Sequence, residues 1–325
     1  MRIIAIEEHF ETAAHRARFP YTPRRLKNFA DRKQQLGHDL ADELLNISDT
    51  RLAAMDAAGI SLQVLSLSIP GCQGLEAAEA IPMARDANDQ MQETVKKYPG
   101  RFAAFAALPT ADPAASAKEL ERTVMQFGFK GALINGHTQG SFLDDRKYWP
   151  IFEAAQALDV PIYLHPRDPH PVVLKTYFEG YEELAFAGWG FAMDTCSHFL
   201  RLVWSGLFDA YPRLKMILGH LGEGLPFWLH RLEDHTRGAA ARRGLKRTPA
   251  QYLTENLIVT CSGNFSGPAF LCTMMALGVD NLLFSVDWPY ESNRTAVDFL
   301  KTLPISEADR EKIAYRNAER VLRLA

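Results

Sequence analysis

Short runs of apolar and β-branched residues recur along this chain, and most of them end in a polar or glycine-bearing tip. Runs of this length, bounded by turn residues, are typical of strands buried on both faces. The pattern predicts eight strands, at residues 2–10, 62–69, 102–108, 131–135, 161–165, 215–220, 257–262 and 282–287.

Segments with helical signals lie between the strands. Asp49-Thr50 can cap a helix that ends at Gly59, and residues 76–98 predict a long helix that starts near Pro82. Strands that alternate with helices indicate parallel β/α units, and eight such units close a barrel. The predicted fold is therefore an α/β protein, a (β/α)8 TIM-type barrel, with residues 1–325 as a single domain. A doubly wound sheet is the alternative, although no Gly-x-Gly-x-x-Gly follows the first strand.

Two connections between predicted elements are longer than a minimal barrel requires. Residues 11–47 follow the first strand and are rich in Arg, Lys and His, and residues 166–192 follow the fifth strand and carry Pro, Tyr, Phe and Trp. Both insertions would lie at the carboxyl ends of the strands, where barrel enzymes build their sites. Long loops in compact domains are usually functional, so we expect both insertions to be walls or lids.

Composition excludes several classes of function. Lys and Arg number 36 against 39 Asp and Glu, a net charge of -3, so there is no basic excess for nucleic acid. No apolar run approaches the ~18 residues of a membrane span, and MRIIAIEEHF does not have the pattern of a signal peptide. The 4 cysteines are widely spaced without a Cys-x-x-Cys, which favours reduced thiols. We expect a cytoplasmic protein.

Polar residues at the strand tips carry the candidate chemistry. Strand alternation puts Glu7 and His9 on one face, the face of Ile3 and Ala5, while Glu8 points the other way. His165 ends the fifth strand and Asp287 ends the eighth. Taken singly, these residues could be surface ion pairs, caps or backbone-bonded histidines. A closed barrel would bring the three tips together around one axis, and the set then predicts a divalent metal site.

A second pair of polar residues follows the sixth strand. His220 ends that strand and Glu223 comes three residues later. Glu223 could hold the tautomer of a catalytic His220, or could serve as an acid at the start of the next helix. Both roles are compatible.

Several stretches carry a resemblance to a known family: EEHF, YLHPR, ILGHLGEGLPF, TCSGNF and LLFSVDWPYE. From Met1 to Leu324 their order and spacing resemble the amidohydrolase superfamily. More narrowly, they resemble its metal-dependent, non-oxidative aromatic-acid decarboxylases of the γ-resorcylate (2,6-dihydroxybenzoate) type. The segment Gly136–Tyr148 and the first insertion depart from that group's pattern.

The resemblance implies roles for individual residues. One Mn²⁺ or Zn²⁺ would be held by Glu7, His9, His165 and Asp287. Asp287 would also deliver a proton, His220 and Glu223 would form a catalytic pair, and Arg231 would contact the substrate in cis or in trans. The resemblance further implies a homo-oligomer, a dimer or a tetramer.

The strand tips favour one metal ion over two. Binuclear amidohydrolases usually have a bridging lysine at the tip of the fourth strand. Here that tip is Asn135-Gly136, and Lys130 lies at the strand's start. One ion could chelate a substrate carboxylate and its ortho oxygen, and a protonated ring carbon would then release CO₂. The predicted function is decarboxylation of an ortho-hydroxybenzoate. A hydrolase or hydratase that uses metal-bound water, and a non-catalytic barrel, are the alternatives.

Overall fold

A computed structural model describes residues 1–47 and 49–324, and it contains all eight predicted strands. The third is divided by Phe105 into two labelled segments. The strands are β1 (Ile4–Phe10), β2 (Leu62–Leu67), β3 (Phe102–Ala104), β4 (Ala106–Ala107), β5 (Ala132–Asn135), β6 (Ile162–His165), β7 (Met216–Leu218), β8 (Leu257–Thr260) and β9 (Leu282–Leu283).

The strands form one parallel series in chain order, from β1 to β3 and from β4 to β9. The two runs are joined at Phe105. Its N–H donates to the Leu65 carbonyl in β2, whereas the next N–H, of Ala106, donates to the Gly131 carbonyl beside β5. The third strand therefore passes directly from one sheet to the other.

Hydrogen bonds between the first strand and the segment after the last one complete the ring. Glu8 and Trp288 form a parallel bridge. The N–H of His9 donates to the Trp288 carbonyl at 2.7 Å, and the N–H of Asp287 donates to the Glu7 carbonyl at 3.1 Å. The predicted (β/α)8 barrel is confirmed, and its closing seam runs through the candidate metal ligands.

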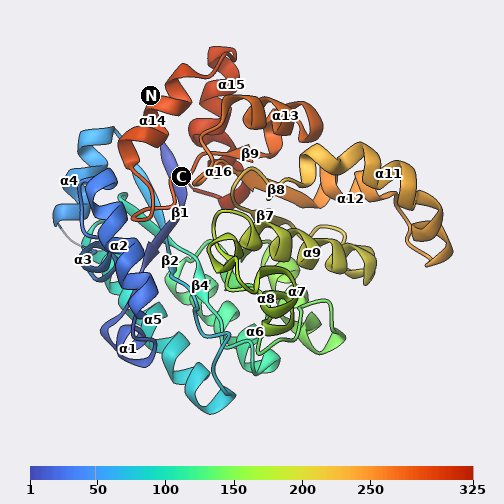
Figure 1. Cartoon of the computed structure of the whole chain (residues 1–325), viewed down its shortest axis with the longest axis horizontal. Coiled ribbons are helices and arrows are strands. Elements are labelled where there is room, and N and C mark those ends of the chain that lie inside the picture. The colour runs from blue at the N-terminus through green and yellow to red at the C-terminus, as the bar shows by residue number, and fades with distance from the viewer. Residues whose placement is uncertain (48, 325) are drawn as a thin grey trace.

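Helices surround the strands (Figure 1). The helices that follow the successive strands include α4 (Asp49–Ala58), α5 (Ala77–Lys97), α6 (Pro113–Arg122), α7 (Trp149–Leu158), α9 (Gly190–Trp204), α11 (Leu225–Arg242), α13 (Gly267–Leu277), α14 (Asn293–Thr302) and α16 (Asn317–Leu322). None of the helices in the described ranges is long and apolar enough to cross a membrane.

The predicted start of the long helix α5 was wrong. The helix begins at Ala77, after the N-cap residue Glu76, and Pro82 lies inside it. Proline removes one helical hydrogen bond, but Ala84 and Met91 lie on the buried face of this helix. Burial of that apolar face outweighs the lost bond.

Both predicted insertions are present and carry their own helices. The first insertion contains α1 (Ala13–Arg18), α2 (Pro23–Leu36) and α3 (Leu40–Leu45). The second contains α8 (Pro171–Phe178) and a short 3₁₀ turn at Glu182–Ala185. The helices of the first insertion lie together on one side of the barrel, beside β1 and β2 (Figure 1).

Candidate metal centre

The four predicted ligands converge at the carboxyl ends of the strands. Their donor atoms all lie within 4.8 Å of one another. Nε2 of His165 lies 3.2 Å from Oε1 of Glu7, and Nε2 of His9 lies 3.2 Å from Oδ1 of Asp287. We call these four residues the metal cluster.

Three atoms of the metal cluster are buried without a hydrogen-bond partner among the described residues: Glu7 Oε1, His9 Nε2 and Asp287 Oδ1. Unpaired buried polar atoms cost free energy, so such a group indicates a bound species that satisfies them. Two carboxylate oxygens and two imidazole nitrogens are suitable ligands for Zn²⁺ or Mn²⁺. The metal cluster fits one divalent metal ion.

Neighbouring groups contact the outward-facing nitrogens of both histidines, and for His165 the contact leaves the inward-facing nitrogen free. Nδ1 of His165 lies 2.7 Å from the Pro166 carbonyl, which only accepts, so Nδ1 carries the proton and Nε2 keeps its lone pair. Nδ1 of His9 lies 3.1 Å from the Ser66 hydroxyl. Burial lowers the pKa of His9, which favours its neutral form. Such outer contacts orient metal-binding histidines.

Hydroxyl groups hold the other oxygen of Glu7. Its Oε2 accepts hydrogen bonds from the hydroxyls of Tyr163, Thr260 and Ser262, so Oε1 turns toward the metal cluster. Burial alone would raise the pKa of Glu7, but His220 and the cluster histidines together bring it below its usual range. Glu7 is therefore an ionised carboxylate.

The sequence prediction missed this hydroxyl cradle. Tyr163 lies two residues before His165 on β6, so strand alternation places both side chains on one face, and that signal was available. Gly219 also belongs here, because a Cβ at this position would lie 2.8 Å from Glu7 Oε2 and 3.0 Å from the Tyr163 hydroxyl. A side chain at Gly219 would displace the carboxylate.

A β-bulge corrects the predicted faces of β1. Ala5 pairs with Gln63 but Glu8 pairs with Leu65, so β1 has one extra residue between these pairs. Ile4 and Ile6, rather than Ile3 and Ala5, pack in the inner cluster that draws residues from every strand of the barrel. The bulge turns Glu7 and His9 into the barrel after two inward isoleucines, and bulges commonly re-aim side chains at active sites.

His220 and Glu223 lie on an unusual turn. Residues 220–224 all have positive φ, from 51° at His220 to 85° at Gly224. This conformation costs non-glycine residues free energy, and it occurs mainly where function requires it. The turn brings Oε1 of Glu223 within 2.7 Å of Nδ1 of His220, so the predicted contact exists.

His220 faces the metal cluster with its other nitrogen. Nε2 lies 3.7 Å from both Glu7 Oε1 and Asp287 Oδ2. Burial would lower the pKa of His220, but Glu223, Glu7 and Asp287 raise it well above the usual value. These carboxylates favour the cationic form of His220, which presents an N–H toward the site.

The backbone of Asp287 is also strained, with a φ of 78°. Burial raises the pKa of its carboxyl group, but the neighbouring side chains of His220 and His9 bring the net value below the usual range. Its side chain is 15% exposed and that of His220 is 23% exposed, so a small molecule can reach both groups.

The first insertion is fastened to the segment that follows Asp287. Arg25 donates to the Tyr290 hydroxyl at 2.8 Å, and Nε2 of His38 lies 2.8 Å from the Pro289 carbonyl. The ring of Tyr290 lies 5.7 Å from that of His9. The insertion therefore forms a wall beside the metal cluster, as predicted.

Arg231 lies away from these groups. It is exposed on α11, and it makes no hydrogen bond or ion pair with the described residues. Helix α11 extends away from the strands (Figure 1). Phe227 and Trp228, on the same helix, are 72% and 52% exposed. The structure gives Arg231 no contact with the metal cluster of its own chain.

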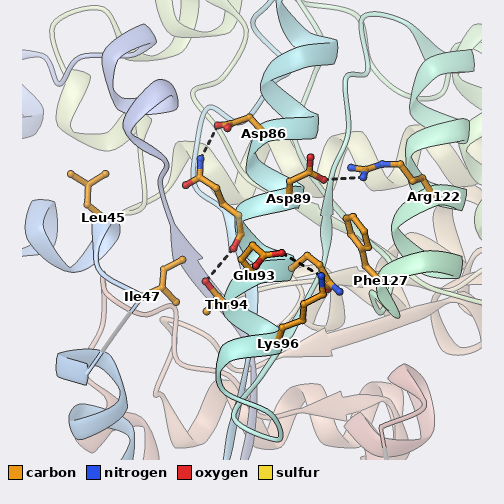
Figure 2. Close-up of a pocket in the computed structure, with 11 residues that line it drawn as sticks. Leu45, Ile47, Asp86, Asp89, Glu93, Thr94, Lys96, Arg122 and Phe127 are labelled. Carbon is orange, nitrogen blue, oxygen red and sulfur yellow. Dashed lines mark hydrogen bonds and ion pairs between the residues drawn. The ribbon is translucent and has the colours of Figure 1, made fainter.

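A separate groove of about 730 Å³ lies along α5, between the end of the first insertion and α6 (Figure 2). Four of its charged side chains form two ion pairs, Arg122 with Asp89 at 2.8 Å and Lys96 with Glu93 at 3.3 Å. No residue of the metal cluster lines this groove. It offers no convergent reactive groups, and we assign it no function.

The barrel with metal ligands at its strand tips defines a class, and comparison with known proteins agrees. The amidohydrolase family model matches residues 17–324, and the chain belongs to this family. A γ-resorcylate decarboxylase from a Polaromonas species is 42% identical, over 99% of this chain and 98% of the relative.

Solved structures show the same similarity. A crystal structure of 2,6-dihydroxybenzoate decarboxylase with 2,6-dihydroxybenzoate is 41% identical, covers 100% of both chains and has a TM-score of 0.89. A dihydroxybenzoic acid decarboxylase from Polaromonas, with bound manganese and the inhibitor 2-nitroresorcinol, is 41% identical, with a TM-score of 0.89 over 99% of this chain and 97% of that one.

Proposed function

We propose that this chain is a metal-dependent, non-oxidative decarboxylase of an ortho-hydroxybenzoate-type acid, with residues 1–325 as one catalytic domain. The observation that carries the proposal is the metal cluster, placed in a chain that aligns over its full length with decarboxylases of 2,6-dihydroxybenzoate. A relative with bound manganese and the inhibitor 2-nitroresorcinol supports Mn²⁺ as the ion in the cluster.

Glu7, His9, His165 and Asp287 hold the metal in this proposal. When bound, a divalent ion supplies a Lewis acid and a fixed point of attachment for a carboxylate and its ortho oxygen. Asn135 ends β5, at the tip where a two-metal site would need a bridging lysine, and this supports a single ion.

The reaction requires a proton at the ring carbon that bears the carboxylate. We assign this proton to the pair formed by His220 and Asp287, whose Nε2 and Oδ2 atoms lie 3.7 Å apart. Cationic His220 balances the charge of the ortho oxygen until it passes its Nε2 proton to Asp287, which delivers the proton to the ring carbon; His220 is then neutral. Glu223 acts through His220 by fixing the Nδ1 proton.

The exposed face of α11 supports a homo-oligomer, a dimer or a tetramer. Phe227 and Trp228 are large, exposed and adjacent, and such patches are typical of protein interfaces. Arg231 lies one turn further along and lacks a partner within the described chain. In an oligomer it would contact the substrate of a neighbouring subunit. Sedimentation that shows a monomer at micromolar concentration would contradict this arrangement.

The test is CO₂ release from ortho-hydroxybenzoates by protein loaded with Mn²⁺. We expect turnover of 2,6-dihydroxybenzoate or a close analogue, and none by Asp287→Asn, which weakens metal binding and removes the proton donor. Ester and amide substrates serve as the comparison. Hydrolysis of these without CO₂ release from any acid would instead indicate the hydrolase.

A further inference from the structure

Glu8 lies between two proposed metal ligands, Glu7 and His9, but its side chain points away from the metal cluster. It is completely buried. No step of the proposed reaction involves Glu8. A buried carboxylate requires a structural account, because burial of an acid is costly unless its oxygens are well paired.

Both oxygens of Glu8 accept hydrogen bonds from the segment that carries Asp287. Oε1 accepts from the Val286 N–H and the Ser285 hydroxyl, each at 3.0 Å. Oε2 accepts from the Trp288 N–H at 3.1 Å. The two backbone donors belong to the residues immediately before and after Asp287, so Glu8 holds the chain on both sides of this proposed ligand.

The backbone of Asp287 needs such support. Its φ of 78° is unfavourable for a residue with a Cβ, and strained residues persist only where their surroundings hold them. The N–H of Asp287 itself donates to the Glu7 carbonyl. The hydrogen bonds of Glu8 on either side prevent the chain from relaxing out of this conformation.

Arg51, a residue of α4, also supports β1. It is completely buried, and its Nη2 donates to the His9 carbonyl at 2.6 Å. The peptide that links His9 to Phe10 is therefore held by a side chain from α4, while the Glu8 side chain holds the backbone on both sides of Asp287.

We propose that Glu8 is a positioning residue: its carboxylate joins β1 to the segment around Asp287, and so fixes the ligands of these two strands at metal-binding separation. This inference rests on the metal site proposed above. It stands on hydrogen-bond geometry, and it predicts that Glu8 contributes to metal affinity without touching the metal.

Glu8→Gln is the informative variant, because it keeps the size of the side chain but turns an amide donor toward one of the N–H or O–H groups. We expect the affinity for Mn²⁺ to fall about 10–100-fold, the usual effect of losing a group that orients ligands. Free Mn²⁺ is counted by electron paramagnetic resonance during titration of the metal-free protein. Circular dichroism and urea unfolding of the metal-free protein are measured in parallel.

Glu119→Gln is the matched control. Glu119 is 9% exposed and accepts from Asn88 at 2.7 Å, on α6 and away from the barrel seam. We expect this variant to lose stability but to retain the Mn²⁺ affinity of the parent protein. If the loss of any buried carboxylate contact were enough to weaken Mn²⁺ binding, the Mn²⁺ affinity would fall equally in both variants.

The outcomes separate the possibilities. If Glu8→Gln is less stable but binds Mn²⁺ as tightly as the parent, the positioning role is overturned and Glu8 is only structural. If the parent itself binds no Mn²⁺, the metal site fails together with this inference. If Glu8→Gln does not fold, Glu8→Asp decides, because it keeps the charge but is one methylene too short to hold the backbone on both sides of Asp287. Loss of about one hydrogen bond should weaken Mn²⁺ binding about 5-fold, and unchanged affinity overturns the proposal.

Discussion

The chain contains two groups of histidines near the carboxyl ends of its strands, and only one of them is suited to metal. The metal cluster includes His9 and His165. The second group consists of His137, His170 and His198, and the ring centroids of His137 and His170 lie 5.8 Å apart. One ring nitrogen of each residue in the second group accepts a backbone N–H, from Gly140, Val172 and Leu143 respectively.

This difference in hydrogen bonding decides the chemistry. A neutral imidazole has one lone pair, and in the second group that lone pair faces a backbone donor, so the remaining nitrogen carries a proton. In the metal cluster the contact of His165 is a carbonyl acceptor, which leaves the lone pair free. The metal cluster also has two carboxylates. Proximity of histidines alone therefore does not define a metal site.

The largest expected effect is the loss of metal in His165→Ala. Removal of one of four ligands should abolish stoichiometric binding and most activity, while the barrel remains folded. Metal analysis of the purified protein and circular dichroism check this. His170→Ala, from the second group, is the matched control and should retain its metal. Stoichiometric metal in His165→Ala would remove this residue from the ligand set.

His220→Asn should leave the metal bound but reduce kcat by about 10²–10⁴-fold, the usual contribution of a placed acid or base. The physical reason is that His220 holds the proton that Asp287 needs. Steady-state kinetics together with metal analysis distinguish this from loss of a ligand. A near-normal kcat on the best substrate would return His220 to the role of a strand-end residue.

The second group should make stability depend on pH. Burial lowers the pKa of His198 to about 3, whereas an unfolded histidine titrates near 6.5. The unfolded chain therefore takes up the proton first. The stabilisation is complete above about pH 6.5 and is lost as the pH falls toward 3, with about 2 kcal/mol lost between pH 7 and pH 5.

The variant His198→Gln sharpens this test, because glutamine does not titrate. Urea unfolding of the metal-free protein at pH 7 and pH 5 should show that the variant loses about 2 kcal/mol less than the parent. Its metal content at pH 7 should be unchanged. An identical pH dependence in the two proteins would show that His198 is not buried in its neutral form.

Glu223→Gln should have the smallest effect, a decrease in kcat of roughly 10-fold, because the amide oxygen still accepts the Nδ1 proton of His220. Loss of the negative charge removes one of the groups that raise the pKa of His220. The alkaline fall in activity should therefore move to lower pH. A pH–rate profile measures this, and an unshifted profile would contradict the coupling.

The sequence predicted the eight strands because each is a short apolar run with a polar tip, and such runs identify buried strands wherever they occur. It also predicted which tips converge, since closure of a barrel follows from the number of units. The ligand roles of Glu7, His9, His165 and Asp287 and the catalytic roles remain predictions, although the structure brings these side chains together.

Features that depend on contacts between distant residues were decided only by the tertiary structure. The bulge in β1 breaks the alternation that the sequence suggests, and the hydroxyl cradle of Glu7 draws on β6 and β8. The hydrogen bonds of Glu8 also depend on the tertiary structure, because the sequence indicates only that this side chain points away from Glu7 and His9. Alternation and spacing are local properties of the chain. The direction of a lone pair, by contrast, depends on which donor or acceptor the fold places beside it.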